Sequence, residues 1–288
     1  MEATVAIKKP RKFWTPSIAM PLHPLQKRVL KLLQENRNPE SYLSGGTMLN
    51  RSETSPRYSK DLDIFHDSVQ EVELAALKDE ETLRSNQFTV EWKLRRPGFF
   101  RAVAIESSGE RVLIEWAQDS NFRFFPLVKD EEVGYRLHDA DLATNKILAL
   151  AGRQTARDFL DALFLHQGYL SLGALIWAAS GKDPGLSPEF ILNEAKRENR
   201  FNQEALEAAT EQLDLAVPID VVQTKETWLK ACEEAEALFA TLPLNDVGCL
   251  YLDKHGKPRT PGNVSGLTPH FASPKGTVPR VMAVPPMA

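Results

Sequence analysis

Two aspartates separated by one residue are the strongest chemical feature of the sequence. Asp61 and Asp63 lie in the alternating segment KDLDIF, which is typical of a half-buried strand. On a strand both carboxylates point to the same face, only about 6 to 7 Å apart. Two like charges at that spacing repel each other unless a cation lies between them. The pair therefore indicates an oxygen-ligand site for Mg²⁺, although a solvated strand edge is the default for an isolated Asp-x-Asp.

A Gly-Gly pair lies a short distance before the aspartates, between a predicted strand and a predicted helix. Ser44 and Thr47 flank Gly45 and Gly46 with hydroxyl groups. Backbone N–H groups at such a turn approach an anion closely, and the helix dipole favours negative charge there. A Gly-Gly turn with a polar cap is also a common structural element, so the turn alone is a weak signal. Next to the paired aspartates it predicts a phosphate cradle beside a metal site.

The elements that must position these residues alternate up to about residue 130. Hydrophobic residues at helical spacing predict helices over 24–35 and 69–84, and a further helix begins at Thr47. Period-two alternation or β-rich composition predicts strands over 41–44, 60–65, 88–92, 101–106 and 111–117. Helices among several neighbouring strands indicate an α+β sheet domain.

The second half of the sequence has a mainly helical pattern. Asp139 caps a predicted helix that Gly152 weakens near its end, so we expect a break there. Thr155 and Asp158 resemble a capping box that starts the next helix. Further helices are predicted over 188–198, 202–213 and 225–240. The break would place Asp158 and Asp161 at the start of a new helix, where Asp161 can pair with Arg157 or another arginine.

Composition excludes several classes of protein. The net charge of −4 and a hydrophobic share of 42% are typical of a soluble globular chain rather than a disordered one. No apolar run approaches the roughly 20 residues of a membrane span, and two cysteines are too few for a disulfide framework. We therefore expect a cytoplasmic protein without a membrane partner. Neither a Walker loop nor a dinucleotide-binding fingerprint is present.

Three motifs in order resemble one known family. They are GGT-x-L-N at 45–50, R-x-S-x-D-x-D at 57–63, and a later lysine and R-D-x-x-D pair around Lys146 and 157–161. This pattern resembles the AbiEii/AbiGii-type nucleotidyltransferase toxin family, part of the superfamily that includes polymerase beta. The resemblance covers roughly residues 40–165. It implies a polymerase beta-like nucleotidyltransferase sheet domain followed by an all-helical domain.

Patterning and composition give a domain order, and the resemblance implies roles for individual residues. The expected parts are a flexible N-terminus (1–20), a nucleotidyltransferase core (21–138), a helical domain (139–245), and a hairpin with a disordered Pro-rich tail (246–288). Asp61 and Asp63 would hold one or two divalent ions, which are Mg²⁺ or, as an alternative, Mn²⁺. Glu115, the acid inside its predicted strand, would be the third carboxylate, or else an outward-facing strand glutamate.

The nucleotide and the proton transfer are assigned in the same way. The residues expected to bind the NTP come from all three motifs: Ser44, Gly45, Gly46, Thr47, Arg57, Ser59, Lys146, Arg153 and Arg157. Asp158 would orient Lys146 or take part in proton transfer. In the alternative without the resemblance, this later cluster is a set of ion pairs on a solvated helix face. His66, a lone histidine after the acidic strand, is expected to be solvated.

The expected activity is Mg²⁺-dependent transfer of a nucleoside monophosphate from an NTP to a hydroxyl, with pyrophosphate as the leaving group. By resemblance the acceptor is the 3′ end of RNA, in particular tRNA, and the protein is a toxin with a cognate antitoxin. Two alternatives remain open from the sequence. The nucleotidyl or phosphoryl group could pass to a protein side chain, or the chain could be a non-catalytic nucleotide-binding scaffold.

Overall fold

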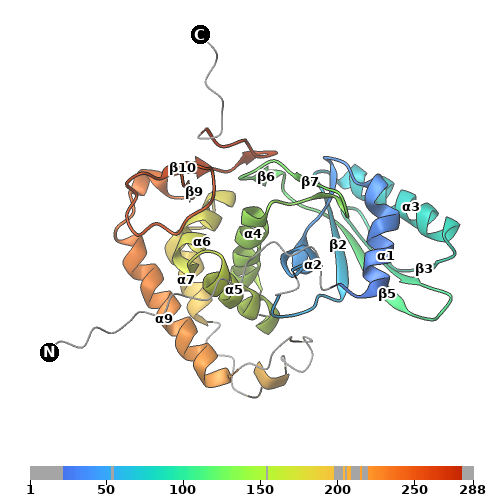
Figure 1. Ribbon diagram of the computed structural model, residues 1–288, viewed down its shortest axis with the longest axis horizontal. Coiled ribbons are helices and arrows are strands. Elements are labelled where there is room, and N and C mark those ends of the chain that lie inside the picture. The colour runs from blue at the N-terminus through green and yellow to red at the C-terminus, as the bar shows by residue number, and fades with distance from the viewer. Residues whose placement is uncertain are drawn as a thin grey trace, which may run out of the picture.

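The computed structural model describes residues 22–280 apart from 53–54, 154, 198–203, 205, 209–214 and 216–219. A mixed sheet forms one side of the molecule and a group of helices the other (Figure 1). The predicted α+β sheet domain followed by a helical region is confirmed. The predicted flexible N-terminus and most of the helix predicted at 202–213 lie outside the described residues.

The main sheet has seven strands in the order β3-β4-β5-β2-β1-β8-β7. In chain order they are β1 (Ser41–Leu43), β2 (Asp61–His66), β3 (Thr89–Arg96), β4 (Phe99–Ile105), β5 (Arg111–Gln118), β7 (Val128–Asp130) and β8 (Gly134–Arg136). The pairs β2–β5 and β1–β8 are parallel, and the other neighbours are antiparallel. The central position of β2 explains why Leu62 and Ile64 are buried.

One face of the sheet is covered by α1 (Pro24–Leu33) and α3 (Val69–Ser85). The indole N–H of Trp116 in β5 donates to Asp79 Oδ2 in α3 at 2.8 Å, which fixes the helix over this face. The guanidinium of Arg37 binds the same carboxylate, so the buried charge of Asp79 is compensated. The residues of β5 that alternate with Trp116 therefore point to the opposite face.

On the opposite face, the helix packing seen in the described part of the chain centres on β2. The short helix α2 (Gly45–Leu49) packs against β2, and α4 (Asp139–Gly152) packs against α2. The expected break is confirmed, because α4 ends at Gly152 and α5 (Ala156–Gly168) begins after Thr155, whose hydroxyl accepts the N–H of Asp158. The later motif thus reaches the sheet through α2.

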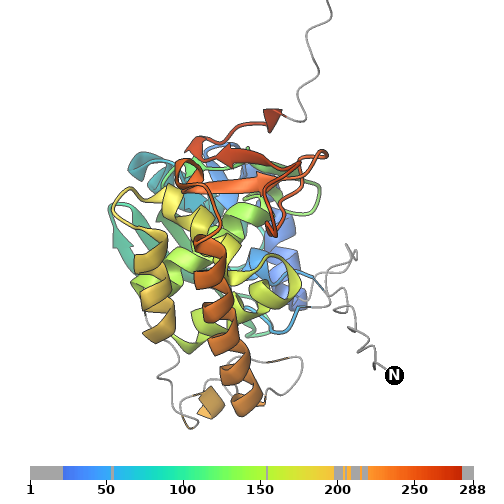
Figure 2. The same ribbon diagram turned by 90° about the vertical axis from the view of Figure 1, so that its left-hand side faces the viewer.

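Of the other described helices, α6 (Leu172–Ala179) and α7 (Pro188–Arg197) pack on α4, and α9 (Val221–Phe239) packs on α6 and α7. The short 3₁₀ turns η1 (Gln34–Asn36), η2 (Ser180–Lys182) and η4 (Leu244–Asp246) lie elsewhere in the chain. Figure 2 shows α9 running along the outside of this group. The rings of Phe159 and Trp228 meet edge to face at 4.8 Å between centroids and join α5 to α9.

Within residues 246–288, the disorder predicted for the tail after the hairpin is wrong for the described part of that tail. Strand β9 (Cys249–Leu252) pairs with β10 (Thr268–Phe271), and β11 (Ser273–Pro274) pairs with β6 (Phe122–Arg123). A tight turn does surround Gly256, as expected for a short hairpin, since the Asp253 N–H donates to the Lys257 carbonyl. Backbone bonds from Lys275 to Asn121 and from Thr277 to Phe124 supply the partners that the Pro- and Gly-rich composition does not reveal.

No individual helix among the described residues has the length and apolar character of a membrane span, although the bent pair α5 with α6–η2 passes that test when taken together.

Candidate active site

Three carboxylates share one face of the sheet at its centre. Asp61 and Asp63 lie on β2, and Glu115 lies on the parallel neighbour β5 in direct register with Asp63. The alternate residues Leu62 and Ile114 are fully buried on the other face. All three acids therefore project toward the side on which α2 and α5 lie, as the period of two predicts for Asp61 and Asp63.

The glycine turn lies directly against Asp63. The backbone N–H of Gly46 donates to Asp63 Oδ2 at 3.1 Å. Gly45 has a φ of +67°, and a Cβ on it would lie 1.9 Å from Asp63 Oδ2. Glycine is therefore required at position 45 both by backbone conformation and by the closeness of the carboxylate.

The two hydroxyl residues that flank the glycines anchor the turn to β2. The N–H of Ser44 donates to the Asp63 carbonyl at 3.1 Å, and the hydroxyl of Thr47 donates to the Asp61 carbonyl. Both side chains are buried. The sequence predicted them as phosphate ligands, whereas the structure gives each a contact that fixes α2 relative to the aspartates.

The charge around Asp63 is not fully compensated. Burial raises the pKa of Asp63 to about 6, and the negative charges of Glu115 and Asp61 add to the shift against the opposing charges of Lys146 and Arg157. A bound cation would remove this repulsion, and paired aspartates are hard oxygen ligands of the kind that Mg²⁺ and Mn²⁺ prefer. Asp61 and Asp63 thus fit a divalent cation by their donor chemistry.

Glu115 is engaged differently from the two aspartates. Its Oε1 accepts from Arg101 Nε at 2.7 Å and lies 2.6 Å from Arg101 Nη2, a contact between neighbouring strands β4 and β5. Within the described ranges, no group of three or more His, Cys, Asp or Glu side chains has metal-binding geometry. Register places Glu115 beside Asp63, and the arginine holds its carboxylate.

Lys146 is held by two carboxylates from the helix that follows it. Its Nζ lies 2.7 Å from Asp158 Oδ1 and 3.0 Å from Asp161 Oδ2, and the residue is only 7% exposed. Arg153 Nε and the Thr155 hydroxyl donate to the other oxygen of Asp158 at 2.6 and 2.7 Å. The later motif is therefore a buried network, and the alternative of ion pairs on a solvated helix face does not describe Lys146, Asp158 or Asp161.

The surroundings of Asp158 argue for a positioning role. Burial by itself raises the pKa of this carboxyl, but the charge of Lys146 and hydrogen bonds from Arg153, Lys146 and Thr155 outweigh it and hold the pKa below its ordinary value. A carboxylate that is stabilised in its charged form by several donors is a poor proton acceptor. Of the two roles predicted for Asp158, orientation of Lys146 is the one that this geometry favours.

Arg57 connects the first motif to the last. Its Nε and Nη2 donate to the two oxygens of Asp161, each at 2.7 Å, and both residues are almost completely buried. A Cβ on Gly46 would lie 3.0 Å from Ser59 Oγ and 3.1 Å from Arg57 Nη2. Arg57 and Ser59 therefore support the glycine turn from behind. An arginine partner was predicted for Asp161, but nothing in the sequence indicates that this partner is Arg57.

Two arginines of the later motif have exposed guanidinium groups beside the acids. Arg157 Nη1 lies 3.8 Å from Asp61 Oδ2 with its side chain 42% exposed. The side chain of Arg153 is 53% exposed although it binds Asp158. The structure thus brings every predicted residue to one region, with Arg157 nearest to the aspartates at the solvent boundary.

The comparison with known families decides the assignment of the chain. The model of the family described as nucleotidyl transferase AbiEii toxin, type IV toxin–antitoxin system, matches residues 31–216. The chain belongs to the AbiEii nucleotidyltransferase toxin family. The match spans the glycine turn, the three carboxylates and the Lys146 network, and it ends before α9 and the C-terminal strands. The predicted family and the predicted enzyme class are confirmed.

Solved structures resemble this AbiEii-family chain at low identity. MenT4, a nucleotidyltransferase toxin from Mycobacterium tuberculosis H37Rv, is 16% identical with a TM-score of 0.51, over 77% of this chain and 83% of that one. JHP933 from Helicobacter pylori is 16% identical with a TM-score of 0.45, over 76% of this chain and 97% of that one. No curated protein matches the chain. The likeness to MenT4 supports the fold.

Proposed function

We propose that this AbiEii-family protein transfers a nucleoside monophosphate from an NTP to a hydroxyl at the 3′ end of RNA, with tRNA as the expected acceptor. The bond that forms joins the acceptor oxygen to the α-phosphorus. The bond that breaks joins the α-phosphorus to the bridging oxygen of the β-phosphate, and pyrophosphate leaves. The acceptor hydroxyl gives up its proton in the same step, to Glu115 or to water.

The observation that carries the proposal is the pair of carboxylates on one face of β2, with Asp63 against the Gly46 N–H and destabilised in its charged form. The two carboxylates would hold Mg²⁺, or Mn²⁺ in its place. A divalent ion bound there supplies charge neutralisation for the triphosphate in the transition state. MenT4, which shares the fold, is a nucleotidyltransferase toxin by name.

The chain's own residues would bind and orient the NTP. Arg157, close to Asp61 and partly exposed, would contact the phosphates directly, and so would Arg153, whose partly exposed side chain binds Asp158. Lys146 would contribute its positive charge from a position fixed by Asp158 and Asp161. Ser44, Gly45, Gly46 and Thr47 would form the wall of the nucleotide site, held from behind by Arg57 and Ser59.

Glu115 is proposed as the third carboxylate of the site. Its register with Asp63 places it beside the reacting centre, and the bond to Arg101 is a surface contact that can exchange. If it acts as ligand or proton acceptor, Glu115→Gln should lower transfer strongly. An unchanged transfer rate in Glu115→Gln would mean that Glu115 only forms the ion pair with Arg101 between β4 and β5.

The acceptor is tested by incubating the protein with each α-labelled NTP, Mg²⁺ and total RNA. The proposal expects label in RNA of tRNA size, and label in protein instead would favour transfer to a side chain. Binding of NTP with no transfer to either would favour a scaffold. We further propose that the protein acts in the cytoplasm as a toxin with a cognate antitoxin. Its expression should then arrest growth, whereas expression of Asp61→Ala should not.

A further inference from the structure

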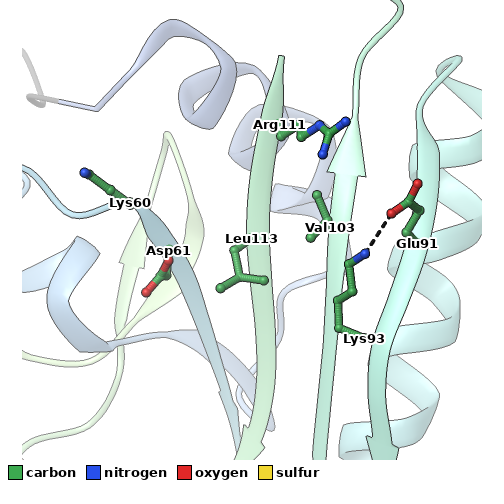
Figure 3. A pocket seen from close by; sticks show the side chains of 7 residues that line it. All are labelled: Lys60, Asp61, Glu91, Lys93, Val103, Arg111 and Leu113. Carbon is green, nitrogen blue, oxygen red and sulfur yellow. Dashed lines mark hydrogen bonds and ion pairs between the residues drawn. The ribbon is translucent and has the colours of Figure 1, made fainter. Parts of the chain in front are cut away.

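A groove extends from Asp61 across the open face of the sheet. It has a volume of about 380 Å³ and is lined by seven residues: Lys60, Asp61, Glu91, Lys93, Val103, Arg111 and Leu113. Figure 3 shows these side chains standing on four adjacent strand segments, with Asp61 at one side and Glu91 at the other. One wall of the groove is therefore a residue of the proposed metal site.

The groove exists because the helical half stops at β2. Helix α3 covers the face that carries Trp116, and in the described ranges α2, backed by α4, packs on the other face against β2. Val103 and Leu113, which stand in register on β4 and β5, point to this second face and are only partly buried. Among the described residues, the helices of the second half leave the surface beyond Asp61 open as this groove.

The groove combines cationic walls with an apolar floor. Lys60, Lys93 and Arg111 bring three positive charges to it, and Val103 and Leu113 form the floor. Of its two acids, Asp61 belongs to the proposed metal site and Glu91 is bonded to Lys93 at 2.8 Å. This pattern fits a chain of phosphates joined by less polar sugar units.

The position of the groove fits the geometry of the reaction. In phosphoryl transfer the attacking and leaving oxygens are roughly in line, so the acceptor approaches from the side opposite to the leaving pyrophosphate. The glycine turn and Arg157 lie toward β1 and α5, whereas the groove lies toward β5, β4 and β3. Strand β2, which carries Asp61 and Asp63, lies between β1 and β5 and so between the two regions (Figure 1).

We infer that this groove binds the sugar–phosphate backbone of a single-stranded RNA acceptor, immediately upstream of its reacting 3′ hydroxyl, through Lys60, Lys93 and Arg111. The inference rests on the proposed function, which it deepens by assigning the acceptor a site. The volume lies at the lower end of small-ligand pockets, about 300 to 1,000 Å³, and so suits a few nucleotide units rather than the surface of a folded protein.

The lining also predicts whether the groove recognises the bases or the backbone of the RNA. None of the seven lining side chains is aromatic or an amide. Base recognition in single strands depends on such stacking and hydrogen-bonding groups, whereas cations contact every phosphate alike. This groove should therefore bind RNA with little dependence on base sequence and with a strong dependence on salt.

The test measures binding of a fluorescent single-stranded RNA 12-mer of mixed sequence to the full chain without NTP, over a range of NaCl concentrations. In Lys93→Ala/Arg111→Ala, the slope of log affinity against log salt should fall by about 1.4, since each phosphate contact contributes about 0.7 for a single strand. The control Lys78→Ala/Lys129→Ala removes the same charge from exposed positions on α3 and β7 and should keep the wild-type slope.

A second variant changes affinity in the opposite direction. Glu91→Gln removes a negative charge from the groove and releases Lys93, so the RNA should bind about twofold to fivefold tighter. This gain does not depend on a destabilised fold. A wild-type slope in the double variant, or weaker RNA binding in Glu91→Gln, would overturn the inference.

Kinetics separate this inference from the proposed function. If transfer to RNA occurs, the double variant should raise the KM for RNA and leave the KM for NTP unchanged. If no acceptor is labelled but the salt slope falls as predicted, the groove is an RNA site and the proposed transfer reaction is wrong. If RNA is labelled at the wild-type KM by the double variant, the reaction stands and the groove assignment is wrong.

Discussion

Asp63 Oδ2 occupies the space that a Cβ on Gly45 would need, at 1.9 Å from its position. The carboxylate and the glycine turn therefore require each other. Because the N–H of the next residue, Gly46, donates to the same oxygen, the turn also fixes where that oxygen points. The turn and the acid behave as one unit, and the first prediction follows from that.

Gly45→Ala should inactivate the protein. The new methyl group would displace Asp63, and alanine at a φ of +67° costs about 1 to 2 kcal/mol. A displacement of about 1 Å in a catalytic group lowers rates by roughly 100-fold. Gly152→Ala is the matched control, since a Cβ there meets nothing within 4 Å. The rate of label transfer and the urea midpoint should both fall in Gly45→Ala, whereas Gly152→Ala should keep the wild-type rate and be as stable as the wild type or slightly more so. An equal loss of transfer in the two variants would argue against the coupling of the turn to Asp63.

Asp63→Asn should stabilise the protein in EDTA at pH 7.5 while abolishing transfer. Burial raises the folded pKa of Asp63 to about 6, above its unfolded value of about 3.9. The associated stability is present below pH 4 and is lost as the pH rises through 6. Removing the charge should therefore add about 3 kcal/mol to the free energy of unfolding at pH 7.5 and little near pH 4.

Urea unfolding of both proteins in EDTA between pH 4 and 8 measures this effect. Mg²⁺ should stabilise the wild type and have little effect on Asp63→Asn, because the variant lacks one proposed ligand. A variant that is less stable than the wild type at pH 7.5 in EDTA would show that the charge of Asp63 is already compensated within the fold.

Arg57→Lys should destabilise the protein more than its chemical similarity suggests. Arg57 binds both oxygens of Asp161 in a buried setting, and lysine cannot reproduce two parallel bonds. We expect a loss of about 3 kcal/mol in the free energy of unfolding. Arg84→Lys, at an exposed pair with Glu80 on α3, is the control and should change it by less than about 0.5 kcal/mol. If Arg57→Lys and Arg84→Lys lowered the free energy of unfolding equally, the buried Arg57–Asp161 pair would not be important for stability.

His66→Gln should reduce the sensitivity of the protein to mild acid. The prediction of a solvated histidine is wrong, because His66 is fully buried on β2, with Nε2 3.0 Å from the Ser41 hydroxyl. Burial lowers its folded pKa to about 3, below the unfolded value of about 6.5. The neutral histidine therefore contributes stability above pH 6.5, which is lost as the pH falls toward 3.

Urea unfolding at pH 7 and pH 5 measures this difference. The decrease in the free energy of unfolding between the two pH values should be about 2 kcal/mol smaller in His66→Gln than in the wild type. An equal decrease in both proteins would mean that His66 takes up its proton without unfolding. Asp63 is present in both and does not affect the comparison.

Local patterns predicted the elements that build the site. Alternation in KDLDIF gave β2 and the common face of its two aspartates, and the capping pair Thr155 and Asp158 gave the start of α5. These signals are local because strand period and helix caps depend on neighbouring residues. Helix α6 was not predicted, since it is apolar on every side and so has no periodicity.

Features set by distant contacts were not predictable. The Arg57–Asp161 pair joins positions 104 residues apart, and the groove depends on the order of β2, β5, β4 and β3 in the sheet. The C-terminal strands gain their backbone partners from β6 and from each other. Composition describes only the segment itself, and its proline and glycine content therefore predicted disorder where tertiary contacts impose order.

The most direct test of the central claim compares label transfer from α-labelled NTP to RNA by the wild type and by Asp63→Asn, each with Mg²⁺ and with EDTA. The wild type should transfer label in the presence of Mg²⁺ and not in EDTA. With Mg²⁺, the rate of Asp63→Asn should be at least about 1,000-fold lower, although urea unfolding shows that this variant is folded. Transfer by Asp63→Asn at the wild-type rate, or transfer by the wild type in EDTA, would contradict the central claim.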